Sequence, residues 1–174
     1  MNLHVTADPR PSDPETRLAD DQNASLRLWL RLLTCTRMIE RDIRERLRAR
    51  FAISLPRFDL MAQLERAPEG LKMNELSRRL MVTGGNVTGL TDQLVAEGLV
   101  ERASMPGDRR AFRVRLTAKG KHAFDRMALE HERWVSALLH ALPERELTEL
   151  HALLGRMKAA IRTAADSPDR KDER

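Results

Sequence analysis

The run from Leu71 to Gly120 constrains this chain most, because two short helical patterns are followed there by a basic hairpin pattern. Met73–Leu80 places its apolar residues on one side of a short helix. Thr83 is a natural N-cap for a second helix, which Gly98 ends. Apolar and Arg residues alternate over Phe112–Leu116, which predicts a strand with one apolar and one basic face. Two helices and an arginine-rich hairpin offer one element for the major groove and one for the minor groove of DNA.

Helical periodicity dominates the rest of the chain, and the low content of Gly and Pro within it favours a mainly α fold with a small β-hairpin. The expected elements are helices from residue 24 to about 51, from 54–56 to before 67, over 73–80, over 83–94, from 117 to about 139 and from 143 onward, with hairpin strands at 99–103 and 111–116 around a turn at 104–108.

In the hairpin, Asp108 and Arg110 form an Asp-x-Arg motif, which is followed by Leu116-Thr117 and then Gly120. This residue order resembles the wing of the MarR family of bacterial transcription regulators. This resemblance covers roughly residues 25–163 and implies a winged helix-turn-helix plus a helical dimerisation region formed by the N- and C-terminal helices. The expected parts are a disordered tail (1–23), the N-terminal dimerisation helix (24–55), the winged helix-turn-helix DNA-binding region (56–116), the C-terminal dimerisation helices (117–163) and a flexible tail (164–174).

The start of the second short helix carries residues suited to DNA. Two glycines inside a helix cost up to about 1 kcal/mol each, and close approach of the backbone to phosphates would explain Gly84 and Gly85. Asn86 matches adenine and Thr88 the thymine methyl group. The alternative is a tight turn with small exposed polar residues. The resemblance places this helix in the major groove, with contacts at the positions of Gly84, Gly85, Asn86 and Thr88. Arg78 and Arg79 on the preceding helix could meet the DNA backbone. The candidate contacts from the two helices are therefore Arg78, Arg79, Thr83, Gly84, Gly85, Asn86 and Thr88.

The hairpin concentrates positive charge, with Arg102 before its turn and Arg113 and Arg115 after it. The resemblance implies that Arg110 enters the minor groove and that Asp108 steadies it, whereas Arg109 meets phosphate. The alternative is a solvated hairpin.

Charge supports an anionic partner. The net charge is +5, but both tails are acidic on balance, so the central region carries about +9. The alternative is an arginine-rich solvated surface.

One cysteine excludes an internal disulfide framework, and no segment has the apolar run of a signal peptide or a membrane span. We therefore expect a cytoplasmic protein without a membrane partner.

Apolar faces at both ends of the chain predict a homodimer. The last helix carries apolar residues at steps of three and four, and the first helix offers a second face, compatible with the same bundle. Joining two chains would set two DNA-reading helices about 34 Å apart, which implies a palindromic operator. The expected dimerisation residues are Leu26, Leu30, Leu33, Leu147, Leu150, Leu154, Met157 and Ile161.

The resemblance also implies a small-molecule effector, commonly an aromatic carboxylate or its coenzyme A thioester, between the dimerisation helices and the DNA-binding lobe. Trp29, Arg37, Arg57 and Phe58 could supply an aromatic wall and a carboxylate partner, or could be ordinary core and solvated residues. No cofactor is expected. Cys35 is expected to be a half-buried, inert thiol, and the histidines lack metal-binding spacing.

Three functions compete. The first is a dimeric repressor that a small molecule releases from one operator, the second an effector-independent architectural DNA-binding protein, and the third a small helical enzyme or adaptor with an acidic partner. No nucleophile motif or paired-carboxylate pattern favours an enzyme. Long helices outside the DNA-reading unit favour the first function.

Overall fold

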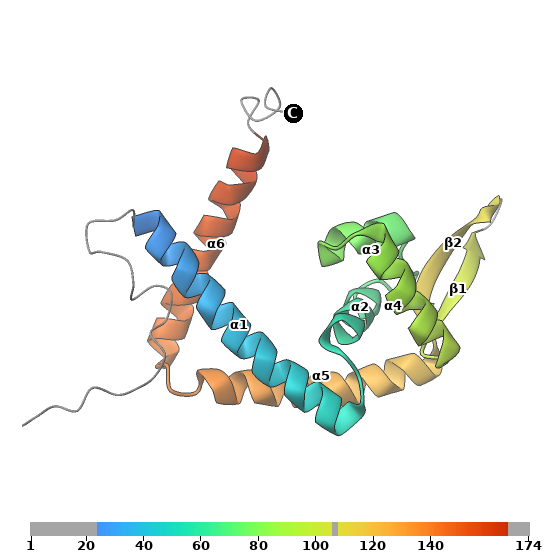
Figure 1. Ribbon diagram of the computed structural model, residues 1–174, viewed down its shortest axis with the longest axis horizontal. Helices are drawn as coiled ribbons and strands as arrows, with labels where there is room; N and C mark the ends of the chain where they lie inside the picture. The colour runs from blue at the N-terminus through green and yellow to red at the C-terminus, as the bar shows by residue number, and fades with distance from the viewer. Residues whose placement is uncertain (1–23, 106–107, 167–174) are drawn as a thin grey trace, which may run out of the picture. The chain divides into compact units, whose positions relative to one another are not determined.

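The computed structural model describes residues 24–105 and 108–166, with side chains left undescribed at 105–111 and 166. The elements are α1 (Ala24–Phe51), α2 (Leu55–Glu65), α3 (Met73–Leu80), α4 (Gly84–Ala96), β1 (Val100–Met105), β2 (Asp108–Leu116), α5 (Ala118–Leu139) and α6 (Glu144–Asp166) (Figure 1). The fold is mainly α with a two-stranded antiparallel hairpin, as expected. The expected tail at 1–23 and residues 167–174 lie outside the described residues, and α6 continues past the expected boundary at residue 163.

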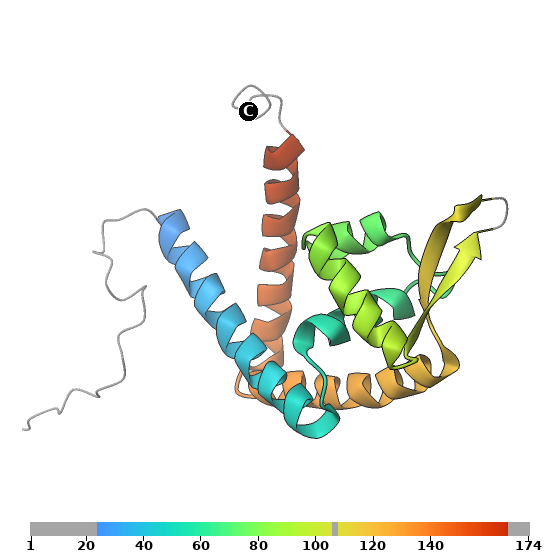
Figure 2. The same cartoon turned by 45° about the vertical axis from the view of Figure 1, so that its right-hand side comes forward.

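The chain divides into two compact units, one ending at Arg133 and one beginning at Trp134. In the first, α2, α3, α4 and the hairpin gather around a shared apolar core (Figure 2). The periodicity of each segment explains why these side chains meet, since each helix has one apolar face. The buried apolar residues of this unit are Ile43, Leu47, Ile53, Phe58, Leu60, Met61, Leu64, Leu71, Leu76, Val87, Leu94, Val100, Val114, Phe124 and Met127.

Helices α2, α4 and α5 begin or end at the capping and stop residues that the sequence predicts. Ser54 occupies the N-cap position of α2 and Pro56 lies in its first turn. The Thr117 hydroxyl accepts a hydrogen bond from the Gly120 amide at 2.9 Å, which caps α5, and donates to the Gly98 carbonyl at 2.8 Å. Gly98 has a φ of +68° just after α4. Its position confirms the expected stop, because glycine adopts this left-handed conformation without strain.

The hairpin is longer than expected. Backbone pairing runs from Val100 opposite Leu116 to Met105 opposite Asp108, with an irregularity between Ser104 and Met105. The expected turn over residues 104–108 was therefore too wide, because ladder hydrogen bonds do not require the apolar alternation by which the strands were predicted. Pro106 and Gly107, which belong to the expected turn, lie outside the described residues.

The loop before α3 is fastened to the hairpin. Leu71 and Val114 exchange two backbone hydrogen bonds of 2.9 and 2.8 Å. Gly70 precedes this bridge with a φ of +81°, and a Cβ there would lie 2.8 Å from the Val114 carbonyl oxygen. The close approach requires glycine, and it fixes the wing relative to α2 and α3.

The second unit comprises the end of α5 and α6. Up to Ala165, α6 has no buried side chain, and Leu150 and Ile161 are 44% and 59% exposed. In the first unit, Leu26 of α1 is 43% exposed.

Within the described residues, no helix has the apolar length that crossing a membrane requires.

Candidate nucleic-acid interface

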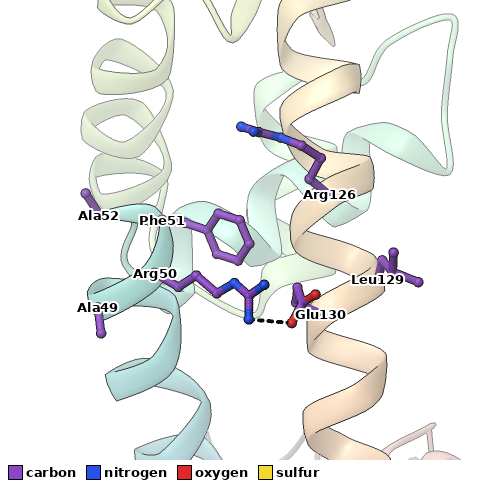
Figure 3. A pocket seen from close by; sticks show the side chains of 7 residues that line it. All are labelled: Ala49, Arg50, Phe51, Ala52, Arg126, Leu129 and Glu130. Atoms are coloured by element: carbon purple, nitrogen blue, oxygen red, sulfur yellow. Dashed lines mark ion pairs between the residues drawn. The ribbon is translucent and has the colours of Figure 1, made fainter.

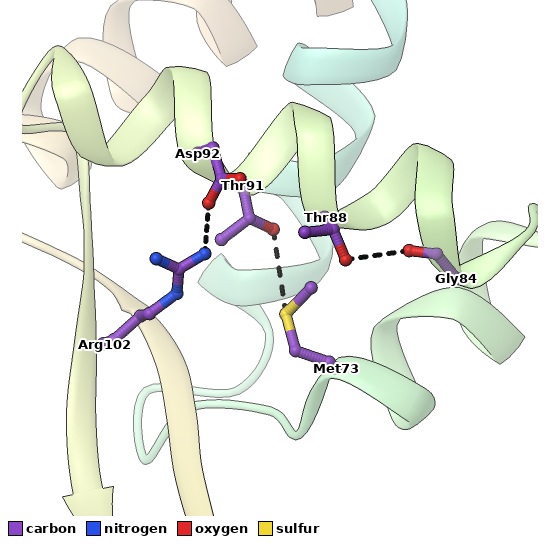
Figure 4. A network of polar contacts seen from close by, with 6 residues as sticks. All are labelled: Met73, Gly84, Thr88, Thr91, Asp92 and Arg102. Carbon is purple, nitrogen blue, oxygen red and sulfur yellow. Dashed lines mark hydrogen bonds and ion pairs between the residues drawn. The ribbon is translucent and has the colours of Figure 1, made fainter.

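The α3–turn–α4 unit buries its inner faces and exposes its outer ones. Leu76 of α3 and Val87 and Leu94 of α4 are fully buried, and the Thr91 hydroxyl lies 3.9 Å from the Met73 sulfur (Figure 4). This packing fixes α4 against α3, so the outward side of α4 is held in one orientation.

The first turn of α4 is open to solvent. Thr83, Gly84, Gly85 and Asn86 are all exposed, and a Cβ at either glycine would meet nothing within 4 Å. Neither glycine is therefore required by packing or by a positive φ. Close approach of another molecule remains as a reason for their presence.

The hydrogen bonding of two threonine hydroxyls at the start of α4 differs from what the sequence predicts. Thr83 occupies the N-cap position, but its hydroxyl makes no capping hydrogen bond, so only its backbone fulfils the expectation. The Thr88 hydroxyl donates to the Gly84 carbonyl at 3.0 Å (Figure 4). This bond turns the hydroxyl back onto its own helix.

The two arginines of α3 differ. Both are exposed, but the Arg79 guanidinium lies 2.7 Å from Glu75 on the same helix. Arg78 forms no ion pair with the side chains that the structure describes. Arg78 is therefore the freer of the two for a phosphate.

The arginines of the two strands form ion pairs and hydrogen bonds with other residues of the same chain. The Arg102 guanidinium pairs with Asp92 of α4 (Figure 4). It also lies 5.4 Å from the centre of the Phe112 ring. Arg113 donates to the Gly70 carbonyl at 2.8 Å, and Arg115 lies 2.7 Å from Glu101. The wing is thus tied to α4 and to the loop before α3. Sequence reasoning missed the contacts of Arg102 and Arg113 because their partners lie on other elements, without a periodic relation. Arg115 and Glu101, in contrast, lie opposite each other in the hairpin.

The outer end of the wing is known only by its backbone. Asp108, Arg109 and Arg110 begin β2, so their backbone continues the hairpin beyond the core. Their side chains lie outside the described residues, and their contacts with DNA stay a prediction.

A hollow of about 450 Å³ lies between α2, the end of α3 and α5. Phe58 stacks on Phe124 with ring centroids 5.5 Å apart, and its ring centroid lies 4.9 Å from that of His131. Burial raises the pKa of Asp59, with a smaller contribution from Glu40, and lowers the pKa of His131. The lining residues are Phe58, Asp59, Ala62, Gln63, Arg66, Arg79, Leu80, Phe124, Ala128 and His131.

The four expected ligand-binding residues do not converge in this chain. Phe58 lines the hollow, whereas Arg57 pairs with Glu97 at the end of α4 and has a buried Nε without a hydrogen-bond partner. Trp29 is 57% exposed and Arg37 is exposed, both on α1. Asp59, Arg66 and His131 were missed, because only the packing of α2 against α5 brings them together.

A second hollow, of about 720 Å³, lies between the end of α1 and α5 (Figure 3). Arg50 reaches across it to Glu130, at 2.8 Å, while Arg126 and Phe51 project into the same space. Its α5 residues lie on the opposite face of that helix from Phe124 and His131, given 3.6 residues per turn. The two hollows are therefore separate.

Cys35 is exposed, which corrects the expectation of a half-buried thiol. Only Ile43 and Leu47 of α1 are buried, so the apolar neighbours of Cys35 do not cover it. Within the described residues, no group of three or more His, Cys, Asp and Glu side chains could hold a metal ion.

Comparison with known proteins identifies the family to which this fold belongs. The MarR family model matches residues 53–111, from before α2 into the wing. The chain is 31% identical over 112 residues to the HTH-type transcriptional regulator PecS of Dickeya dadantii, covering 63% of this chain and 68% of that protein. The chain belongs to the MarR family. It is a DNA-binding transcription regulator and not an enzyme.

Solved structures agree with this assignment. A MarR family transcriptional regulator from Silicibacter pomeroyi is 34% identical with a TM-score of 0.70, covering 83% of this chain and 99% of that one. CouR from Rhodococcus jostii RHA1, solved bound to p-coumaroyl-CoA, shares the fold with a TM-score of 0.67 at 18% identity, covering 78% of this chain and 94% of that one.

Proposed function

We propose that this MarR family protein is a homodimeric, sequence-specific repressor. In this proposal α4 reads the major groove of a palindromic operator, and the wing places Arg110 in the minor groove. The supporting observation is the exposed first turn of α4, where Gly84 and Gly85 have no packing reason to be glycine. A helix start without side chains lets its amides approach phosphate oxygens.

Exposed apolar surface supports the dimer. Leu150 and Ile161 of α6, like Leu26 of α1, leave more than two fifths of their surface open in a single chain. Burying such faces against a second copy is favourable by about 25 cal/mol per Å² of apolar surface. A two-fold axis through this interface pairs two wings and two α4 helices with the half-sites of a palindrome.

The hollow beside Phe58 supports an effector that is an aromatic acid or its coenzyme A thioester. Phe58 and Phe124 offer aromatic surface, while Arg66 and Arg79 offer cations for a carboxylate or phosphate. CouR, which shares the fold, was solved with a coenzyme A thioester bound. Arg79 also belongs to α3, so a ligand that draws it away from Glu75 would disturb the DNA-reading unit.

An architectural protein without an effector is the alternative, because the same basic surface would bind DNA of any sequence. Footprinting separates the two proposals. A repressor protects one palindromic site and releases it when an aromatic acid or its thioester is added. Uniform protection along the DNA, unchanged by any such compound, would contradict the proposed repressor. We propose that this transcription regulator acts in the cytoplasm.

Substitutions at the wing test the DNA-binding mode. Arg110→Ala is expected to weaken operator binding by about 1–3 kcal/mol while the dimer stays folded. Arg109→Ala is expected to lower affinity evenly across sequences and to reduce the salt dependence, as the loss of a phosphate contact does. Gel-shift titrations at several salt concentrations measure both effects. Equal operator affinity for wild type and Arg110→Ala would contradict the wing assignment.

A further inference from the structure

Met81, between α3 and α4, is an apolar side chain in an unfavourable position. It is 92% exposed, the highest value among the exposed large apolar residues of the described chain. Its φ is +55°, in the left-handed region that glycine and asparagine occupy most readily. The position therefore gains nothing from burial and carries backbone strain, so folding gives no reason for methionine here.

The turn that carries Met81 is held firmly. The Met81 amide donates to the Arg78 carbonyl at 3.3 Å, and the Val82 amide donates to the Ser77 carbonyl at 3.2 Å. The Ser77 hydroxyl donates to the Val82 carbonyl at 2.6 Å. These bonds fix where the Met81 side chain leaves the backbone, immediately before the exposed start of α4.

Other exposed apolar residues have a different setting. Those of α1, α5 and α6 lie on helices of the expected dimerisation region, and Phe112 lies beneath the Arg102 guanidinium. Met81 and its neighbour Val82, which is 37% exposed, instead adjoin Thr83, Gly84 and Gly85. Whatever approaches the first turn of α4 also meets Met81.

We propose that Met81 is a specificity-determining residue that packs its thioether side chain against the C5-methyl group of a thymine in the operator. This inference rests on the proposed placement of α4 in the major groove. The thymine methyl is the apolar group that base edges present there. A long, unbranched side chain with a polarizable sulfur adapts its shape to such a group.

The test uses the full-length protein and an operator duplex selected by the wild type from random DNA. Each thymine in turn is replaced by uracil, which lacks only the methyl group. Wild-type affinity is expected to fall about three- to ten-fold at one thymine in each half-site, as the loss of one buried methyl predicts. Met81→Gly, which relieves the positive φ, is expected to lose affinity by a similar factor on the normal operator and to be indifferent to uracil at that position. Met81→Leu is expected to retain the preference for thymine.

Controls separate this contact from folding and from general DNA affinity. Thermal unfolding is expected to show Met81→Gly at least as stable as wild type, because glycine relieves the positive φ. Wild-type affinity for Met81→Gly on the operator would overturn the inference, and so would a uniform loss on operator and unrelated duplexes. A wild type that selects no preferred duplex would overturn the proposed function itself, and this inference with it.

Discussion

Some single residues of the first unit have structural roles that the residue type alone does not reveal. Gly120 was part of the motif that identified the wing, and the structure supplies its physical role. A Cβ at Gly120 would lie 1.8 Å from the Leu99 carbonyl oxygen. The start of α5 therefore approaches the end of α4 so closely that only glycine fits, which positions the hairpin between them.

Gly120→Ala is expected to lower the free energy of unfolding by about 3 kcal/mol or more, because the new methyl group overlaps backbone that cannot move without shifting α5. Chemical denaturation measures the change. Gly155→Ala in α6 is the matched control, since a Cβ there meets nothing within 4 Å, and it is expected to leave stability unchanged or raise it. A Gly120→Ala protein as stable as wild type would contradict the close approach.

His131 gives the fold a pH dependence. Burial lowers its pKa from the ordinary 6.5, so the unfolded chain binds its proton more readily than the folded protein does. This contribution to stability is present above pH 6.5 and is lost as the pH falls from 6.5 through the lowered folded value. Asp59 acts oppositely in a more acidic range, because its raised pKa favours the folded state as the pH falls toward 3.8.

His131→Phe, which keeps an aromatic ring beside Phe58, is expected to flatten the dependence of the melting temperature on pH just below 6.5. Calorimetry of both proteins across that range measures the difference. An unchanged pH profile in the variant would show that other groups cause the dependence.

At the scale of elements, α4 combines a well-packed half with an open first turn. Leu94 and Val87 anchor it, Asp92 joins it to the wing through Arg102, and the exposed start is free of neighbours. Stability and DNA binding therefore make opposite demands on Gly85. Alanine favours the helix, whereas glycine favours close approach of another molecule.

Gly85→Ala is accordingly expected to raise the free energy of unfolding by about 0.5–1 kcal/mol and to weaken operator binding at the same time. Denaturation and gel-shift titration on the same preparation measure the two effects. Undiminished affinity in a stabilised variant would show that the glycines serve no close approach to DNA.

At the scale of the whole molecule, the proposed dimer determines whether two DNA-reading units act together. The Leu147, Leu150, Leu154, Met157 and Ile161 seam repeats at helical spacing, yet none of these residues is buried in the single chain. A folded monomer with so much exposed apolar surface is expected to be unstable alone.

Leu150→Asp combined with Leu154→Asp is expected to lower thermal stability and to abolish cooperative operator binding together, because two carboxylates would be buried in the interface. Sedimentation and gel-shift titration measure the two consequences. A wild-type protein that stays monomeric at micromolar concentration, or one chain that binds a half-site with full affinity, would contradict the dimer.

The sequence by itself determined the order and type of the elements, since apolar spacing and capping residues act locally. The Met73–Leu80 helix, the stop at Gly98 and the cap at Thr117 could each be predicted from neighbouring residues. The residue order of the wing also indicated the family. Tertiary structure decided which distant groups meet: Arg102 with Asp92, Arg57 with Glu97, and Phe58 with Phe124 and His131. These contacts depend on how helices pack, which local periodicity leaves open. For the same reason, the exposure of Cys35 and the strained position of Met81 emerged only from the folded chain.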